Sequence, residues 1–263
     1  MKISIITVNF NNAKGLERTI NSVREQTYKE IEFIVIDGFS TDESKNIILK
    51  NQDIISYWIS EKDNGIYDAM NKGIKVCSGD YVLFLNSGDF LTNRKIIRNI
   101  FIRKYTEDLI VGRQLFINTK GKVGRSPKLN YKDFNITYFL SSTLPHQATF
   151  IKSSLFWKIG LYDTTYKVSA DWVFWIKAII ENNCNIRIIN KNISYMEEGG
   201  VSSNMGKCYA DMSRFMDECL KNGIIKWEEI FKYSVKGRMQ DYCYRNKLLS
   251  LVNKIIIGIG KRI

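Results

Sequence analysis

The chain has 263 residues, of which 44% are hydrophobic and 25% are charged, and only two are proline. This composition is typical of a globular protein and excludes a disordered chain, and no apolar stretch reaches the roughly 18 residues of a membrane-spanning helix. The net charge of +12 is unevenly placed, because residues 1–90 hold 10 Lys or Arg against 13 Asp or Glu, whereas residues 221–263 hold 10 against 3.

The first half of the chain predicts alternating strands and helices, which indicate a mainly parallel α/β sheet flanked by helices. The predicted elements are strands over 2–8, 31–36, 54–59 and 81–85, and helices over 16–26, from 40, from about 66 to 76 and over 96–101. Ser40 and Glu43 have the spacing of a capping box, and Thr92 is a candidate cap for the fourth helix.

The pattern is weaker after Asp108. It predicts strands over 109–111, 115–117 and 146–152, a polar loop over 124–135, a helix over 171–180, a strand pair over 185–195 and helix from 206 onward. We therefore expect one domain over 1–205, with halves 1–110 and 111–205, and a basic helical extension over 206–263. The first strand begins without signal-peptide features, which favours a cytoplasmic protein, and the five cysteines lack CxxC pairs and are expected to be reduced thiols.

Two of the predicted strands lead into acidic side chains, at Asp37 and at Asn86-Ser87-Gly88-Asp89. Ligands of parallel sheets bind beyond the carboxyl ends of the strands. An acid there would repel a bare phosphate, so these acids predict contacts to a base or ribose and to a divalent cation. No glycine-rich phosphate loop is present, and the single histidine, His146, excludes a two-histidine metal site. The pattern indicates a nucleotide-sugar site.

Four segments, 7–11, 35–42, 61–73 and 79–89, resemble in order the motifs of family 2 glycosyltransferases, especially the branch found in bacterial O-antigen and capsule gene clusters. The resemblance continues through 145–147 and 169–172 to about residue 203. It implies a GT-A fold, a nucleotide-diphosphate-sugar donor and inversion at the anomeric carbon.

For the donor, the resemblance implies that Thr7 and Asn9 meet the nucleoside and that Asp37 accepts from the uracil imide N–H. It also implies that Asp63, Asn64 and Gly65 pass under the base and ribose, and that Asn71 lies near the diphosphate. Asp37 could instead cap the next helix. Lys72 could supply the charge of an arginine that the family often has where this chain has Met70, or could be a solvated lysine.

Asn86-Ser87-Gly88-Asp89 aligns with the Asp-x-Asp-Asp metal motif of the family, but only Asp89 keeps a carboxylate. The resemblance implies Mn²⁺ or Mg²⁺ at Asp89, with the Asn86 oxygen as a neutral ligand and weak affinity in the absence of donor. A helix-capping role is the alternative for Asp89.

Asp171 matches the catalytic acid of the family and is the candidate general base, although acids are also favoured in the first turn of any helix. His146 and Trp172 match the acceptor side, with a structural histidine and a core tryptophan as alternatives. Residues 199–203 are predicted to form a loop that closes over the donor.

The apolar and lysine-spaced segment 247–263 predicts a helix that lies on anionic lipid or docks on the protein's own core. Together these features predict a metal-dependent inverting glycosyltransferase, peripheral at the inner face of the bacterial inner membrane. Its donor would be a UDP-hexose or UDP-N-acetylhexosamine and its acceptor a lipid-linked saccharide. The alternatives are a nucleotide-sugar-binding protein without catalysis and a nucleic-acid-binding protein, the latter favoured by charge alone.

Overall fold

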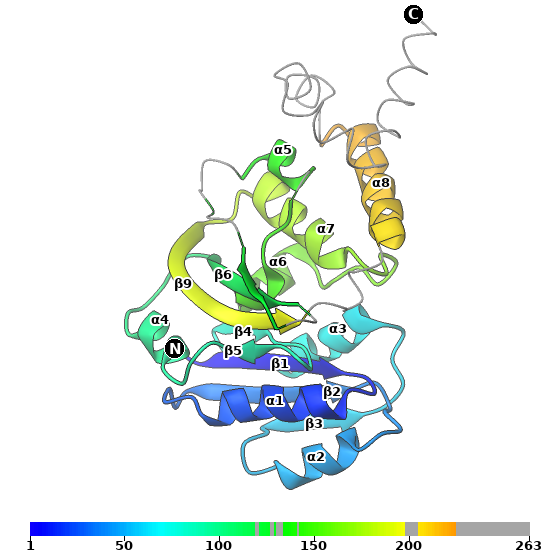
Figure 1. Cartoon of the computed structure of the whole chain (residues 1–263). Coiled ribbons are helices and arrows are strands. Elements are labelled where there is room, and N and C mark those ends of the chain that lie inside the picture. Colours follow the sequence, from blue (N-terminus) through cyan, green and yellow to red (C-terminus); the bar gives the residue numbers. More distant parts are fainter. Residues whose placement is uncertain (119–120, 127–128, 130–133, 141, 198–204, 225–263) are drawn as a thin grey trace, which may run out of the picture.

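The computed structural model describes residues 1–118, 121–126, 129, 134–140, 142–197 and 205–224. These residues form one mixed sheet of nine strands with helices on both faces (Figure 1). The first half contains β1 (Ile3–Asn9), α1 (Ala13–Arg24), β2 (Ile31–Asp37), α2 (Ser44–Lys50), β3 (Tyr57–Ser60), α3 (Ile66–Val76), β4 (Tyr81–Phe84), β5 (Phe90–Leu91) and α4 (Ile96–Phe101). The second half contains β6 (Leu109–Ile117), β7 (Val123–Arg125), α5 (Ile136–Phe139), a 3-10 turn η2 (His146–Ala148), β8 (Thr149–Lys152), α6 (Ser153–Ile159), α7 (Ala170–Ile176), a π-helical turn η3 (Lys177–Glu181), β9 (Ile186–Glu197) and α8 (Met205–Lys221).

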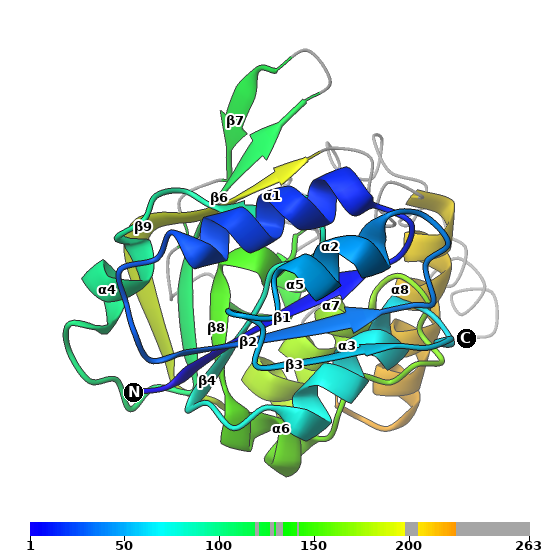
Figure 2. The ribbon, with the colours of Figure 1, turned by 90° about the horizontal axis from the view of Figure 1, so that it is seen from below.

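The strand order is β3-β2-β1-β4-β8-β6-β9-β5, and β7 pairs with β6 as a hairpin that extends away from the body of the molecule (Figure 2). Strands β3, β2, β1 and β4 are parallel, whereas β8 is antiparallel to both β4 and β6. Because β6 and β9 are parallel, the carboxyl ends of β1, β2, β4, β6 and β9 lie at the same edge of the sheet.

Two hydrophobic cores cover the two faces of the sheet, as the alternation along β1 shows. Ile3 and Ile5 pack with α1, α2 and α4, while Ile6 and Val8 pack on the other face with α3, α5, α6, α7 and α8. Helix α3 approaches β1 closely at Gly73, where a Cβ atom would lie 2.5 Å from Ile6 Cγ2. Among the described residues, no helix is both long and apolar enough to span a bilayer.

Two predicted helix caps are wrong, because their hydroxyl groups bond to other elements. The Ser40 hydroxyl donates to Asp37 Oδ1, and α2 begins at Ser44, after Glu43. The Thr92 hydroxyl donates to the carbonyl of Asn192 in β9. It therefore connects the segment before α4 to the sheet and does not cap the helix.

The second half differs more from the predictions. The predicted strands 109–111 and 115–117 are one strand, β6, and the predicted strand pair 185–195 is the single long strand β9. Its register against β6 shifts between Val111 and Gln114, which marks a bulge. The short elements β5, β7, α5 and α6 were not predicted. The four described cysteines, Cys77, Cys184, Cys208 and Cys219, are free as expected. The predicted loop 199–203, the helix 247–263 and most of the extension 206–263 lie outside the described residues.

Candidate active site

The carboxyl ends of β1, β2 and β3 place Asn9, Asp37 and Ser60 side by side in the sheet register. The Asp37 carboxylate is fully buried and accepts four hydrogen bonds. Oδ1 accepts from Asn9 Nδ2 (2.7 Å) and the Ser40 hydroxyl (2.5 Å), and Oδ2 accepts from the Ser60 hydroxyl (2.6 Å) and Ser40 N (3.0 Å). Asp37 therefore organises this edge of the sheet, and its direct contact with a base stays a prediction.

Asn9 keeps a free acceptor at the same edge, because its Oδ1 atom is buried and has no hydrogen-bond partner. Buried polar atoms without partners are rare and are often completed by a ligand. The neighbouring Thr7 is fully buried, and its hydroxyl donates to the Leu85 carbonyl at 2.7 Å. Thr7 therefore joins the ends of β1 and β4, and of the two predicted nucleoside contacts only Asn9 offers an unused atom.

Two exposed aromatic side chains, which sequence reasoning missed, lie next to this edge. Phe10 is 66% exposed and Phe39 is 55% exposed. Phe39 also has a positive φ of 66°, an uncommon conformation for a bulky residue that is enriched at functional sites. The sequence contained a signal for these exposed aromatic residues, because each phenylalanine stands within a polar segment next to a motif residue.

Gly38 allows the predicted base-and-ribose segment to pack against the end of β2. A Cβ atom on Gly38 would lie 2.5 Å from Asp63 Oδ2 and 3.3 Å from Phe10 Cδ2. Asp63 Oδ1 accepts from Gly65 N at 3.0 Å, and Gly65 itself has a φ of 113°, which glycine adopts readily. Asp63, Asn64 and Gly65 thus form a tight turn at the start of α3, beside Phe10.

Asn71 and Lys72 are committed to structural contacts. The Asn71 amide donates to the Tyr162 carbonyl (2.8 Å) and accepts from Tyr162 N (3.0 Å), so it fastens α3 to the segment before α7. Lys72 pairs with Glu61 at 2.8 Å and donates to the Lys62 carbonyl. A contact of Asn71 with the diphosphate stays a prediction that this geometry does not favour, and the Lys72 charge is already neutralised.

The predicted metal motif lies between β4 and β5. The Asn86 Oδ1 atom is buried and has no partner, and the Asp89 side chain is buried nearby in the sequence. Burial raises the pKa of the Asp89 carboxyl to about 8, even though a hydrogen bond from Gln147 opposes the shift. Gly88 has a φ of 104°, so a side chain at this position would be strained.

The residues of this motif fit a weakly held hard cation. Asp89 supplies one carboxylate and Asn86 one unused amide oxygen, both of the type that Mg²⁺ and Mn²⁺ prefer. Within the described ranges, no cluster of three or more His, Cys, Asp or Glu side chains could hold a metal ion. Phosphate oxygens of a donor would have to complete the coordination.

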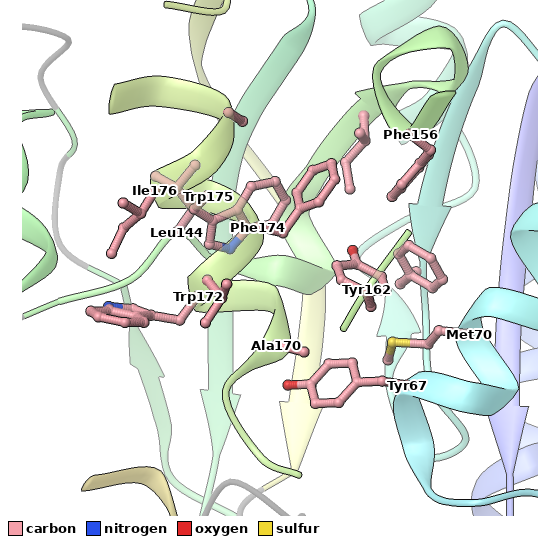
Figure 3. Close-up of a cluster of buried hydrophobic side chains, with 14 of the residues drawn as sticks. Tyr67, Met70, Leu144, Phe156, Tyr162, Ala170, Trp172, Phe174, Trp175 and Ile176 are labelled. Atoms are coloured by element: carbon pink, nitrogen blue, oxygen red, sulfur yellow. The ribbon is translucent and has the colours of Figure 1, made fainter. Parts of the chain in front are cut away.

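Asp171 lies in the first turn of α7 and is half-buried. The Tyr67 hydroxyl of α3 lies 2.7 Å from Asp171 Oδ1 and 2.8 Å from the Val168 carbonyl, and Figure 3 shows this ring directed toward the start of α7. Burial and the negative charge of Asp171 raise the pKa of Tyr67 well above its usual value, so the phenol remains a donor. Tyr67 therefore positions the Asp171 carboxylate, a role that sequence reasoning missed.

His146 is buried in the core that also contains Phe84 and Tyr162. Its ring stacks on Phe84 of β4 at 4.8 Å, and its Nε2 atom lies 2.9 Å from the Tyr162 hydroxyl. Burial lowers the pKa of His146 despite the charge of Asp171, so the imidazole is neutral. The structural interpretation of His146 is favoured over direct contact with an acceptor.

Trp172 belongs to the hydrophobic core (Figure 3). Its side chain is 2% exposed, and its indole N–H donates to the Phe139 carbonyl at 2.8 Å. The ring also packs edge-on against Phe215 of α8. This burial favours the core interpretation of Trp172, and its contact with an acceptor stays a prediction.

Comparison with known proteins decides the family. The family model described as Glycosyl transferase family 2 matches residues 4–160, which is more than half of the chain. The chain belongs to this family. It is 36% identical over 181 residues to a glycosyltransferase of Mycobacterium tuberculosis, covering 68% of this chain and 69% of the relative. It is 31% identical over 209 residues to a PGL/p-HBAD biosynthesis glycosyltransferase of Mycobacterium bovis, covering 77% of this chain and 79% of the relative.

Solved structures confirm the GT-A fold of this family 2 glycosyltransferase. S. aureus TarS 1-349 in complex with UDP-GlcNAc matches with a TM-score of 0.64 at 21% identity, covering 84% of this chain and 67% of TarS 1-349. The mannosyltransferase PcManGT from Pyrobaculum calidifontis, in complex with GDP-Man and Mn²⁺, matches with a TM-score of 0.61 at 14% identity, covering 84% of this chain and 64% of the other.

Proposed function

We propose that the chain transfers a hexose or N-acetylhexosamine from a UDP-sugar, with inversion, and that Asp171 is the general base. The observation that carries this proposal is the Asp171 carboxylate, half-buried and held by Tyr67, which itself lies two residues after the turn at Gly65. A carboxylate oriented in this way, beside an edge with unused acceptors at Asn9 and Asn86, supports chemistry on a bound donor.

The proposed reaction is a single in-line displacement. Asp171 accepts the proton of an acceptor hydroxyl as that oxygen attacks the anomeric carbon, and the bond from this carbon to the diphosphate breaks. Asn9 and Asp37 would hydrogen-bond the base, and the exposed ring of Phe10 offers a surface on which a base can stack. Mn²⁺ or Mg²⁺ held by Asp89 and Asn86 would neutralise charge on the leaving diphosphate.

We further propose a lipid-linked saccharide as acceptor and peripheral association with an anionic membrane. The basic segment 221–263 supports this proposal, as does the similarity to a relative named for PGL/p-HBAD biosynthesis. The similar structures are complexes of TarS with UDP-GlcNAc and of PcManGT with GDP-Man and Mn²⁺, and both UDP-GlcNAc and GDP-Man are nucleotide-sugar donors. The uracil role given to Asp37 favours UDP.

The test compares Asp171→Asn with the wild type for sugar transfer and for UDP binding in the presence of Mn²⁺. We expect transfer to be lost while UDP still raises the melting temperature, because a saturating ligand at about 100 times its dissociation constant stabilises a fold by about 2.7 kcal/mol. Asp53→Asn, which alters an exposed partner of Arg24, is the matched control.

Three results would contradict the proposal in different ways. A wild-type rate for Asp171→Asn would remove Asp171 as the base. A preference for GDP over UDP would contradict the role of Asp37. UDP binding by the wild type without transfer to any saccharide acceptor would favour the nucleotide-sugar-binding alternative, which the reduced metal motif makes the main competitor.

A further inference from the structure

A cavity of about 460 Å³ lies between α4, β6, β7 and β9, and none of the residues assigned to the donor lines it. Three positively charged side chains line it, Arg113 from β6, Arg125 from β7 and Lys191 from β9. None of its lining residues is acidic. The cavity therefore combines three cations from three different strands without a counter-charge.

These three cations have no partner of opposite charge, in contrast to several other arginines of the described chain. Arg18, Arg24 and Arg187 each form an ion pair with a carboxylate. In the part of the chain that the structure describes, no ion pair or side-chain hydrogen bond involves Arg113, Arg125 or Lys191. Like charges that share a cavity repel one another, and a bound anion would relieve this repulsion.

The bulge in β9 builds one wall of this cavity. Val111 pairs with Ile188 and Arg113 with Asn192, so β9 has two extra residues opposite this step of β6. Bulges re-aim side chains and are common next to binding sites. Here the bulged segment brings Asn190, Lys191 and Asn192 to the cavity, which Asn99 of α4 also lines.

We propose that this cavity is a second binding site, which takes the phosphate group of a phosphorylated saccharide. Arginine side chains match the geometry of phosphate oxygens with paired N–H donors, and a lysine adds a point charge. The cavity is larger than a lone phosphate requires and falls within the range of small-ligand sites. Asparagine amides on its walls can bond the hydroxyl groups of an attached sugar.

The proposed site is distinct from the catalytic one and goes beyond the proposed function. Ile96 of α4 lines the cavity and belongs to the core on one face of the sheet, whereas Tyr67 and Trp172 belong to the core on the other face. Tyr195 connects the cavity to the metal motif, because it lines the cavity and stacks at 4.8 Å on Phe90, the residue after Asp89. A ligand in the cavity would thus lie near the metal motif without sharing its ligands.

The experiment titrates the full chain with sodium pyrophosphate and with glucose 1-phosphate in the presence of EDTA, so that binding through a donor-site metal is suppressed. We expect Arg113→Gln and Arg125→Gln each to weaken binding about tenfold, as the loss of a charge-assisted contact predicts. Arg113→Lys keeps the positive charge without the paired N–H donors, so its affinity should lie between that of the glutamine variants and that of the wild type. UDP binding with Mn²⁺ should not change. Arg103→Gln, an exposed arginine over the Tyr105 ring, is the control.

Absence of binding by the wild type, or equal binding by the wild type and the glutamine variants, would overturn the proposal. If an arginine-to-glutamine variant has a lower melting temperature than the wild type, its weaker binding could reflect damage to the fold. Lys191→Gln then replaces it in the binding comparison, because the Lys191 side chain is exposed. Vesicles of phosphatidylcholine with and without phosphatidylglycerol separate the sources of phosphate. Arg113-dependent binding to the anionic vesicles, with none to glucose 1-phosphate, would overturn the saccharide part and assign the cavity to a lipid headgroup.

Discussion

The Asp171 carboxylate depends on one neighbouring hydroxyl for its orientation. Tyr67 bonds both Asp171 Oδ1 and the Val168 carbonyl, and its ring packs 5.5 Å from that of Tyr162. A general base must be held within reach of the proton that it accepts, so a residue that fixes the carboxylate contributes to the rate without touching the donor.

We therefore expect Tyr67→Phe to lower kcat about 10- to 100-fold while the KM for the donor stays nearly unchanged. The measurement is steady-state kinetics at varied donor concentration, with melting temperature as a check on the fold. Tyr28→Phe removes a comparable bond, from a phenol to the Met1 carbonyl at 2.6 Å, far from the site. An equal loss of activity in both variants would show that Tyr67 stabilises the fold and does not act through the position of Asp171.

We expect Asp89 to couple protonation to stability and to the proposed metal binding. In the folded state the carboxyl keeps its proton up to about pH 8, compared with an ordinary value of 3.8. Between these values the folded state binds more protons than the unfolded state, so the free energy of unfolding falls as the pH rises.

Asp89→Asn has no proton to lose, so its melting temperature relative to the wild type should rise across this pH window. Stabilisation of the wild type by UDP with Mn²⁺ should grow over the same window, because the cation must displace the proton. Differential scanning fluorimetry with and without Mn²⁺ measures both effects. A melting difference that does not change with pH would show that Asp89 is ionised throughout.

At the scale of elements, Glu32 connects the starts of β1 and β2 with the turn before β4. Its carboxylate accepts from Lys2 Nζ (2.8 Å), the Ser4 hydroxyl (2.6 Å) and Ser78 N (2.7 Å). Burial alone would raise the pKa of Glu32, but these hydrogen bonds outweigh it and lower the pKa to about 2 from 4.5.

A lowered pKa stabilises the fold above the unfolded value, and this stabilisation is lost as the pH falls from about 4.5 toward 2. Glu32→Gln should therefore unfold about 1–2 kcal/mol more easily at neutral pH and approach the wild type in acid. Urea denaturation at several pH values measures the difference. Glu17→Gln, an exposed residue of α1, should show no such trend.

The sequence predicted the first four strands and most of the first four helices because their apolar residues alternate or recur with clear periods. It did not predict β5, whose two residues are held only by pairing with β9. The sequence predicted two strands in place of each of β6 and β9, because polar residues at a bulge interrupt the apolar pattern. Both strands continue through the bulge.

The candidate site, like the fold, could be predicted from the sequence only in part. The motifs predicted Asn9, Asp37, Asn86, Asp89 and Asp171 as site residues from residue type and order along the chain, and these roles stay predictions. They could not distinguish an accessible side chain from an enclosed one. Asn71 and Trp172 match the family in sequence, yet their polar atoms are bonded within the protein, which only tertiary packing decides.

At the scale of the whole molecule, the surplus positive charge lies mainly beyond the first 90 residues, and the segment 247–263 combines three lysines with an apolar remainder. We expect the full chain to bind vesicles that contain phosphatidylglycerol and a chain lacking 247–263 to bind them less, with UDP binding retained. Vesicle sedimentation measures this. Binding should weaken with salt, since the Debye length is about 10 Å at 0.1 M, but persist through apolar contacts. Equal sedimentation of both chains with the vesicles would show that the segment 247–263 does not contribute to membrane binding.

The pairing of β5 with β9 has a consequence for how the protein reaches its active state. Phe90 and Leu91 immediately follow Asp89, and their partners Tyr195 and Ser194 lie near the end of β9, the last strand along the described part of the chain, so they leave the ribosome about 100 residues later. Contacts between such distant segments form late, because closing a long loop is entropically slow. A nascent chain that has completed β1 to β4 therefore holds the edge proposed to bind the base before the proposed metal motif is anchored. In refolding experiments, UDP binding without metal should recover before the dependence on Mn²⁺ appears.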